Sequence, residues 1–172
     1  MSSTSGWSRW SGNRLFLPGV LFYGAGEHRG VDGAEIAVGN GATLAERIAE
    51  RRAGTGDPRA LVGELRRAPL LVPLGGDGLW TARFRGVRWI CAFTDDRALA
   101  RFLDRHGSGD REWEYAVLLG ARLLDEIIPA MAEPAGVAVD VADEDGAMLF
   151  PPVVGIVPEA AAVDAEAREG GH

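Results

Sequence analysis

A chain of 172 residues, of which 47% are hydrophobic and 25% charged, is long enough for one globular domain with a buried core. Its net charge of −7 and pI of about 5.0 argue against broad electrostatic binding to nucleic acids or to anionic membranes. We therefore expect no nucleic-acid partner and no membrane partner. The chain holds no lysine, and its high content of Arg, Ala and Gly is typical of a GC-rich genome such as an actinobacterial one.

The single cysteine, Cys91, excludes an intrachain disulfide and fits a reducing compartment. No run of residues approaches the roughly 20 apolar positions that a membrane span needs. The apolar stretch 15–23 is divided by Pro18 and Gly19, and no small-residue cleavage site follows it, so we do not interpret it as a secretory signal. We predict a cytoplasmic protein.

The first 40 residues are rich in Gly and Ser and show no regular hydrophobic period, which predicts a poorly ordered N-terminal tail, 1–40. The alternative is that this tail does not belong to the native protein and that translation starts downstream. A single domain is expected over residues 43–158. A C-terminal tail of Ala, Glu and Gly, 159–172, follows it.

Two amphipathic helices are predicted before the first strand of this domain. Thr43 and Glu46 form a capping box for the first helix, which Gly54 ends. Asp57 and Pro58 predict the cap and the first residue of the second helix. The arginines of both helices are expected to lie on solvated faces.

A short apolar run at 70–73, bounded by prolines, predicts a strand, and the prolines favour an edge position. The cluster at 75–78 predicts a turn. A phosphate-binding loop is excluded there, because neither a Lys-Ser/Thr pair nor a helix follows.

The stretch 79–106 organises the remaining pattern. Alternating segments at 79–84 and 87–93, separated by Arg85-Gly86, predict a tight hairpin. The side chains expected to face the core are Trp80, Ala82 and Phe84 on the first strand and Val87, Trp89, Cys91 and Phe93 on the second. Cys91 is then a buried small hydrophobe and not a nucleophile.

A helix is predicted directly after the hairpin. Thr94 is its expected cap, with Asp95 and Asp96 in the first turn. Arg101 and Arg105 lie in the last turns, where the helix dipole favours positive charge. All these charges have a role in folding, so the adjacent carboxylates are not predicted to be catalytic.

The C-terminal half adds strands at 114–119, 136–141 and 147–150, and a helix at 121–131 that Pro129 kinks or ends. The second of these strands is almost wholly apolar, which indicates a central position. The order of elements predicts an α+β fold, with a mixed β-sheet built on a central hairpin and helices packed against it.

No residue pattern indicates catalysis, a cofactor or a metal. The three histidines are far apart and there is no cysteine pair, so zinc-ligand spacing is lacking. The acidic turn 140–146 suggests calcium, but an EF-hand register would place Val141 and Pro152 at ligand positions. We predict no catalytic residue, no cofactor and no metal site.

Aromatic residues and arginines near the hairpin define a candidate interaction surface. Most sheet aromatics are expected in the core, with Trp80 and Trp113 the best candidates for exposure. Arg83, Arg85 and Arg88 flank them. Trp and Arg are enriched at interface hot spots. These five residues form the predicted surface, and a protein is the predicted partner.

Several motifs occur in a characteristic order. They are PLLVPL at 69–74, GLW at 78–80, WICAFTDD at 89–96, EYAVLLGARLLDEIIPA at 114–130 and GVAVDVADEDGAMLFPP at 136–152. Together they resemble the SseB N-terminal-domain family in its actinobacterial form, over about residues 57–163. The resemblance implies an α+β domain without established catalysis, and it carries over no catalytic residue.

Two functions of different classes follow. The first is a non-catalytic protein-interaction or regulatory module. The alternative is a small-ligand-binding or enzymatic domain with a pocket near the acidic turn 140–146, motivated by the position of this turn beside a buried strand. The two hypotheses differ in whether Asp140 and Asp143 face a cleft.

Overall fold

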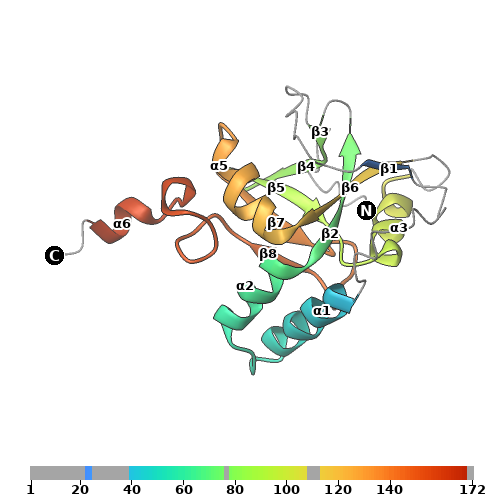
Figure 1. Ribbon diagram of the computed structural model, residues 1–172, viewed down its shortest axis with the longest axis horizontal. Coiled ribbons are helices and arrows are strands. Elements are labelled where there is room, and N and C mark those ends of the chain that lie inside the picture. Colours follow the sequence, from blue (N-terminus) through green and yellow to red (C-terminus); the bar gives the residue numbers. More distant parts are fainter. Residues whose placement is uncertain (1–21, 25–38, 76–77, 108–112, 170–172) are drawn as a thin grey trace, which may run out of the picture.

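A computed structural model of the chain describes residues 22–24, 39–75, 78–107 and 113–169, with side chains between 43 and 167. These residues form an α+β fold in which helices cover two four-stranded sheets (Figure 1). The predicted fold class is confirmed. Two sheets are present where one was expected, because the chain passes from one sheet to the other within the predicted hairpin.

The first sheet is antiparallel and has the strand order β1-β6-β2-β3. Its strands are β1 (Phe22–Gly24), β2 (Pro69–Gly75), β3 (Gly78–Leu79) and β6 (Glu114–Leu119). β6 has the bounds predicted from the sequence. β1 falls within the predicted N-terminal tail, whose other residues up to 38 lie outside the described part of the chain. The two central residues of the turn between β2 and β3 also lie outside it.

β2 lies between β6 and β3, so the edge position predicted for it is wrong. Leu71 exchanges backbone hydrogen bonds of 2.9 and 2.8 Å with Phe93, on the side of β2 that faces away from β6. Residues two apart in a strand direct their N–H groups to the same side. Pro69 and Pro73 therefore lack donors only on this side, and the ladder with β6 stays intact.

The second sheet has the strand order β4-β5-β7-β8. Its strands are β4 (Thr81–Phe84), β5 (Val87–Ala92), β7 (Ala135–Val139) and β8 (Met148–Phe150). β5 and β7 are parallel, and the other pairs are antiparallel. Every residue of β7 is buried, which confirms the predicted central position. The β4–β5 hairpin is present as predicted, although β4 lies at the edge of the sheet.

Trp80 joins the two sheets. The strand predicted over 79–84 is divided at this residue, with β3 before it and β4 after it. Its N–H donates to the Pro73 carbonyl oxygen at 2.7 Å, and its carbonyl accepts from the Cys91 N–H at 3.3 Å. One residue is thus hydrogen-bonded into both sheets.

α1 (Gly39–Arg52) and α2 (Pro58–Arg67) pack side by side next to the sheets (Figure 1). Asp57 caps α2 as predicted, and its carboxylate accepts the backbone N–H two residues on at 3.1 Å. The cap predicted at Thr43 is wrong, because α1 begins at Gly39 and Thr43 lies in its second turn.

α3 (Asp96–Arg105) follows β5 as predicted. Its N-cap is Asp95, whose Oδ1 accepts the Ala98 N–H at 2.7 Å. Thr94, the predicted cap, lies one residue too early and binds Asp140 instead. A carboxylate at the cap also interacts favourably with the positive end of the helix dipole.

The helix predicted over 121–131 has three segments: α4 (Gly120–Arg122), a π-helical turn η1 (Leu123–Ile127) and α5 (Ile128–Ala130). Pro129 lies at its end, as expected, and has no N–H to donate to the preceding wide turn. Gly120 begins the helix against α2, where a Cβ would lie 1.8 Å from the Leu65 carbonyl oxygen. Only glycine fits this contact.

Two apolar cores cover the two faces of the second sheet. The smaller lies under α3 and contains Ala82, Cys91, Phe93, Ala98, Leu99, Phe102, Leu103 and Ala142. The larger lies on the side of α1, α2 and the helix 120–130. Cys91 and Phe93 are buried as predicted, but Ile90 and Ala92 on the opposite face are also fully buried. Both faces of β5 are therefore core faces.

After β8 the chain returns across the body of the domain. The Val163 N–H donates to the Pro152 carbonyl oxygen at 2.8 Å. The 3₁₀ turn η2 (Glu159–Ala161) packs against the larger core, and α6 (Ala165–Glu169) extends away from the body (Figure 1). Across the described ranges, no helix is long and apolar enough to cross a membrane.

Candidate interaction surface

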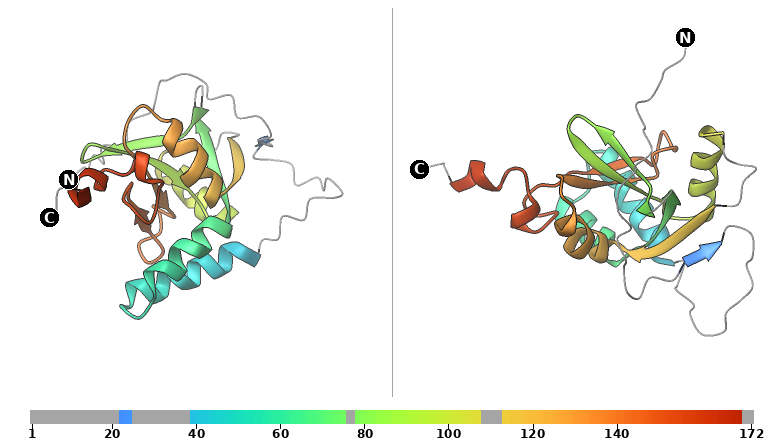
Figure 2. Two further views of the ribbon diagram at one scale, coloured as in Figure 1. Left: turned by 60° about the vertical axis from the view of Figure 1, so that its left-hand side comes forward. Right: turned by 90° about the horizontal axis from the view of Figure 1, so that it is seen from above.

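The β4–β5 hairpin carries three of the five residues of the predicted surface, and it projects from the body of the domain (Figure 2). Its turn consists of Arg85 and Gly86, with φ of 51° and 77°. Two consecutive positive φ angles are typical of a type I′ turn, whose twist matches that of the flanking strands. The predicted tight turn is confirmed, and Arg85 is exposed at its tip.

Arg83 and Arg88 are register partners across the hairpin and lie on the same face of it. Both pair with Glu133, which precedes β7, and the Arg88 Nη2 lies 2.8 Å from its Oε2. Hydrogen bonds from Arg88 and, as the second largest cause, from Arg83 hold the pKa of Glu133 below its usual value. Both guanidinium groups of this face thus contact the Glu133 carboxylate.

The two arginines differ in burial. The Arg88 side chain is only 12% exposed and also donates to the Thr81 hydroxyl at 3.2 Å. The Arg83 side chain is 55% exposed. Arg88 is therefore part of the packed hairpin, whereas Arg83 presents more than half of its side chain to solvent.

Phe84 lies on the opposite face of β4 from Arg83 and is 53% exposed. The alternation of the strand predicted that it is buried with Trp80 and Ala82, and this prediction is wrong. The apolar cluster under α3 reaches Ala82 but not the tip of the hairpin. The Arg85 guanidinium carbon lies 5.2 Å from the Phe84 ring centroid, within the range of a cation–π interaction.

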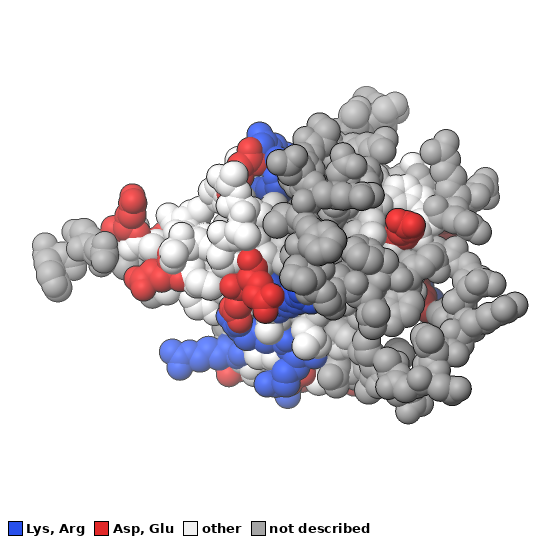
Figure 3. Space-filling view, turned by 45° about the horizontal axis from the view of Figure 1, so that its top comes forward, with Lys and Arg blue, Asp and Glu red and all other residues white. Residues whose placement is uncertain are grey.

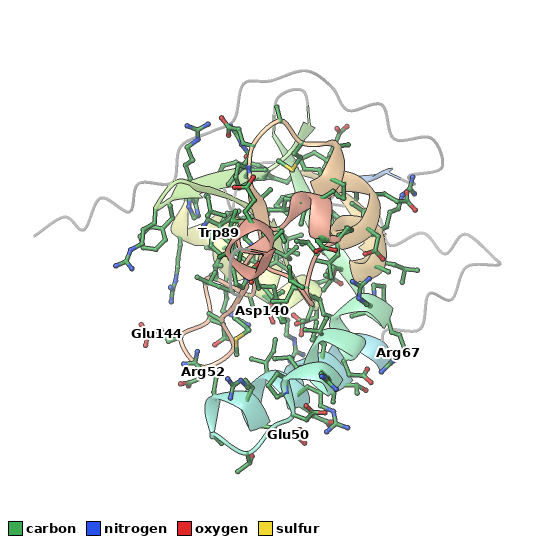
Figure 4. All side chains as sticks on the ribbon, turned by 90° about the vertical axis from the view of Figure 1, so that its left-hand side faces the viewer. Glu50, Arg52, Arg67, Trp89, Asp140 and Glu144 are labelled. Carbon is green, nitrogen blue, oxygen red and sulfur yellow. The ribbon has the colours of Figure 1, made fainter. Side chains whose placement is uncertain are left out.

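Trp89 anchors the tip of the hairpin to β7. Its Nε1–H donates to the Phe84 carbonyl oxygen at 3.3 Å. Its ring packs on Gly136, where a Cβ would come within 2.7 Å of the ring atom Cζ3. Trp89 is buried and lies beside the strands of the sheet that carries the hairpin (Figure 4). The exposed tip therefore rests on a fixed support.

Trp80 and Trp113 lie together, with ring centroids 5.1 Å apart. Trp80 also contacts Phe102 and His106 edge-on, at 5.7 and 5.8 Å. Its Nε1–H is buried without an acceptor in the described part of the chain. Both tryptophans pack partly buried on the smaller core. The structure thus places the tryptophan pair on the α3 side and Arg83 with Arg88 on the other face.

Asp140 lies at the end of β7 and points into the body of the domain (Figure 4). It is 5% exposed and has a positive φ of 49°. Its Oδ1 accepts the Thr94 N–H at 2.9 Å and its Oδ2 accepts the Thr94 hydroxyl at 2.7 Å. Burial raises the pKa of the carboxyl, although the Thr94 hydrogen bonds oppose this rise.

The backbone of the acidic turn and the Asp143 side chain are also bound within the fold, whereas the Glu144 and Asp145 side chains are exposed. The Arg52 guanidinium donates to the Glu144 and Ala147 carbonyl oxygens at 2.8 and 2.9 Å, and Figure 4 shows Arg52 and Glu144 side by side. Arg101 pairs with Asp143 at 3.1 Å. Asp140 therefore faces β5 and Asp143 faces α3, and the turn fastens β7 to α1 and α3.

The single cysteine lies in the core of the domain. Burial raises the pKa of the Cys91 thiol to about 12, so the thiol is protonated at neutral pH. Among the described residues, no three or more His, Cys, Asp or Glu side chains are grouped to hold a metal. His106 lies at the end of α3, and its Nδ1 lies 2.8 Å from the Phe102 carbonyl oxygen.

Sequence reasoning missed Phe84 and Glu133 as members of this surface. The place of Phe84 beside the turn residues Arg85-Gly86 was a usable sign, because a hairpin tip extends beyond the layer that covers its sheet. Nothing in the sequence marks Glu133. It reaches Arg88 because β5 and β7 pair in parallel, with the Arg88 N–H on the Pro134 carbonyl oxygen at 3.0 Å.

No family model, no curated protein and no solved structure matches this chain. The resemblance to the SseB N-terminal-domain family stays a prediction.

Proposed function

We propose that this domain is a non-catalytic protein-interaction module of the SseB N-terminal type, and that it binds its partner through the β4–β5 hairpin. One observation carries this proposal. The hairpin presents the half-exposed Arg83 and an Arg85 stacked on the exposed Phe84. Aromatic residues and arginine are enriched in protein interfaces relative to the rest of the surface.

The contacts within the hairpin support this function. Trp89 ties the tip to the sheet, and Arg88 ties its base to Thr81 and Glu133. A surface that is already ordered loses less conformational entropy on binding. Arg83 and Phe84 are therefore presented in a fixed arrangement.

The alternative, a ligand pocket or active site near the acidic turn 140–146, has less support. The carboxylate of Asp140 is bound by Thr94 and that of Asp143 by Arg101. A ligand at this turn would have to displace contacts that hold β7 to its neighbours.

Photo-crosslinking tests the proposed function. Phe84 is replaced by a photoreactive benzoylphenylalanine, and the protein is irradiated in lysate of the native host. We expect a defined protein adduct that disappears in the Arg83→Glu, Arg85→Glu variant. The matched control is Arg59→Glu, Arg97→Glu, which makes the same charge change at exposed positions on α2 and α3. Equal adducts in both variants, or no adduct from position 84, would contradict the proposal.

A further inference from the structure

We infer that the partner contributes an extended acidic segment, which adds as a strand to the outer edge of β4 and alternates carboxylate with apolar side chains. This inference names the partner chemistry for the proposed function and rests on it. Its grounds are the backbone edge of β4, the different faces of that strand and the contacts of Glu133.

Among the described residues, no strand pairs with the outer edge of β4. In the described part of the chain, β4 pairs only with β5. The two-residue turn closes on the pair Phe84 and Val87, and hydrogen-bonded and non-hydrogen-bonded pairs alternate from there. The bond from the Cys91 N–H to the Trp80 carbonyl fits this alternation. This alternation of pairs directs the N–H and C=O groups of Thr81 and Arg83 to the outer edge of β4, where an added strand would bind.

The two faces of β4 differ in chemistry. Arg83 lies on one face together with its cross-strand partner Arg88, and Phe84 lies on the other. Side chains of a strand alternate between faces, and neighbouring strands place their side chains side by side. A strand added at this edge would therefore set every second side chain beside Arg83 and the others beside Phe84. The complementary sequence alternates acidic and apolar residues.

Glu133 shows that the arginine face binds a carboxylate in its present geometry. Its carboxylate pairs with both Arg83 and Arg88. A guanidinium group has five N–H donors, and the Arg83 side chain is 55% exposed, so it can bind a second carboxylate from outside.

A second copy of this chain is a poorer occupant of the same edge. Pairing β4 with itself would place Arg83 and Arg85 of one copy near those of the other, and like charges opposite each other are destabilising. Arginines at a sheet edge oppose self-association in this way. A nucleic acid is also disfavoured, because acidic and basic side chains lie next to each other in small groups on the face shown in Figure 3.

Peptide binding tests the inference on the full chain. Three fluorescein-labelled seven-residue peptides are used, in which Glu alternates with Val, Leu or Phe, and anisotropy and amide NMR spectra are recorded. We expect at least one peptide to bind with Kd below about 1 mM, to shift the Thr81 and Arg83 amide resonances, and to bind about tenfold more weakly when salt rises from about 0.05 to about 0.3 M.

Matched variants and peptides separate the parts of the inference. The Arg83→Glu, Arg85→Glu variant should lose about tenfold in affinity and the Arg59→Glu, Arg97→Glu control less than about twofold. A Lys-for-Glu peptide, and a peptide N-methylated at every second residue so that it cannot pair as a strand, should not bind wild-type protein. The inference is overturned if the Lys-for-Glu peptide or the N-methylated peptide binds. It is also overturned if all three acidic peptides fail to bind. If the position-84 adduct still forms and depends on Arg83 and Arg85, the proposed function stands with a partner of other chemistry.

Discussion

The hairpin tip and the acidic turn lie at opposite ends of the same sheet and use their charges in opposite ways. Because β5 and β7 are parallel, the tip before β5 and the turn after β7 are separated by the length of the strands. In the acidic turn, Asp140 and Asp143 are bound by Thr94 and Arg101. At the tip, Arg83 also pairs with Glu133, but its side chain stays 55% exposed, and Arg85 is exposed.

This difference shows that the density of charge along a chain does not indicate which charged side chains the fold leaves exposed. The turn has four acidic residues within 140–145, yet its role is to hold elements together. The hairpin has fewer charges, but they lie on a projecting element beside an exposed aromatic ring. The clearest difference between the two regions is burial, since Asp140 is 5% exposed and the Arg83 side chain 55%.

Removing the Asp140 carboxylate should have the largest effect on stability. In Asp140→Ala, the Thr94 N–H and hydroxyl lose their acceptor in a buried site, and alanine is less tolerant of the positive φ. We expect a loss of about 3 kcal/mol in the free energy of unfolding, measured by urea denaturation. The control is Asp145→Ala in the same turn, which is exposed and should change stability by less than about 0.5 kcal/mol.

The support of the hairpin should be the next most sensitive feature. Trp89→Phe removes the hydrogen bond to the Phe84 carbonyl and leaves space beside Gly136, so we expect a loss of about 1–2 kcal/mol. Amide hydrogen exchange should accelerate at the tip. A stability equal to that of the exposed-ring control, Phe84→Ala, would show that the indole does not anchor the turn.

The two regions should also respond to pH in opposite directions. The pKa of Asp140 is raised from 3.8 by burial, so its contribution to stability is fully present below pH 3.8 and is lost as pH rises through the raised value. The pKa of Glu133 is lowered from 4.5, so its contribution is present above pH 4.5 and is lost as pH falls. The test is the difference in unfolding free energy between wild type and each of the variants Asp140→Asn and Glu133→Gln, measured between about pH 3 and 7. This difference should fall with rising pH for Asp140→Asn and rise with pH for Glu133→Gln. Slopes of the same sign would refute the contrast.

The smallest effect is expected at Arg83. Arg83→Ala removes an exposed guanidinium group, and exposed ion pairs contribute little, so the melting temperature should not change measurably. Its cross-strand partner provides the comparison. Arg88→Ala should cost about 1 kcal/mol or more, because Arg88 is largely buried and bonded to Thr81. Equal effects of the two substitutions would show that the hairpin face is packed throughout.

Much of the fold could be predicted from the sequence, because its local rules held. The strand at 114–119, the cap at Asp57 and the Arg85-Gly86 turn all depend on residues close together in the chain. Several of the errors involve distant contacts. Asp95 caps α3, and Thr94 instead binds Asp140, which lies 46 residues away.

The candidate surface was only partly predictable for the same reason. The alternation of side chains correctly placed Arg83 on the face of β4 opposite to Ala82. It could not show where the apolar core under α3 ends, so Phe84 was wrongly predicted to be buried. The ion pair of Glu133 with Arg88 joins residues 45 apart in the sequence and requires the parallel pairing of β5 with β7. No local pattern contains this information.

The shared position of Trp80 has a consequence for how the domain opens. Since this one residue is hydrogen-bonded to Pro73 in one sheet and to Cys91 in the other, the boundary between the sheets is not a line of weak contacts. Local opening that starts at the hairpin tip must stop before Trp80 or release both sheets together. The amides of Trp80 and Cys91 should therefore belong to a single cooperative unit, and the two sheets unfold as one.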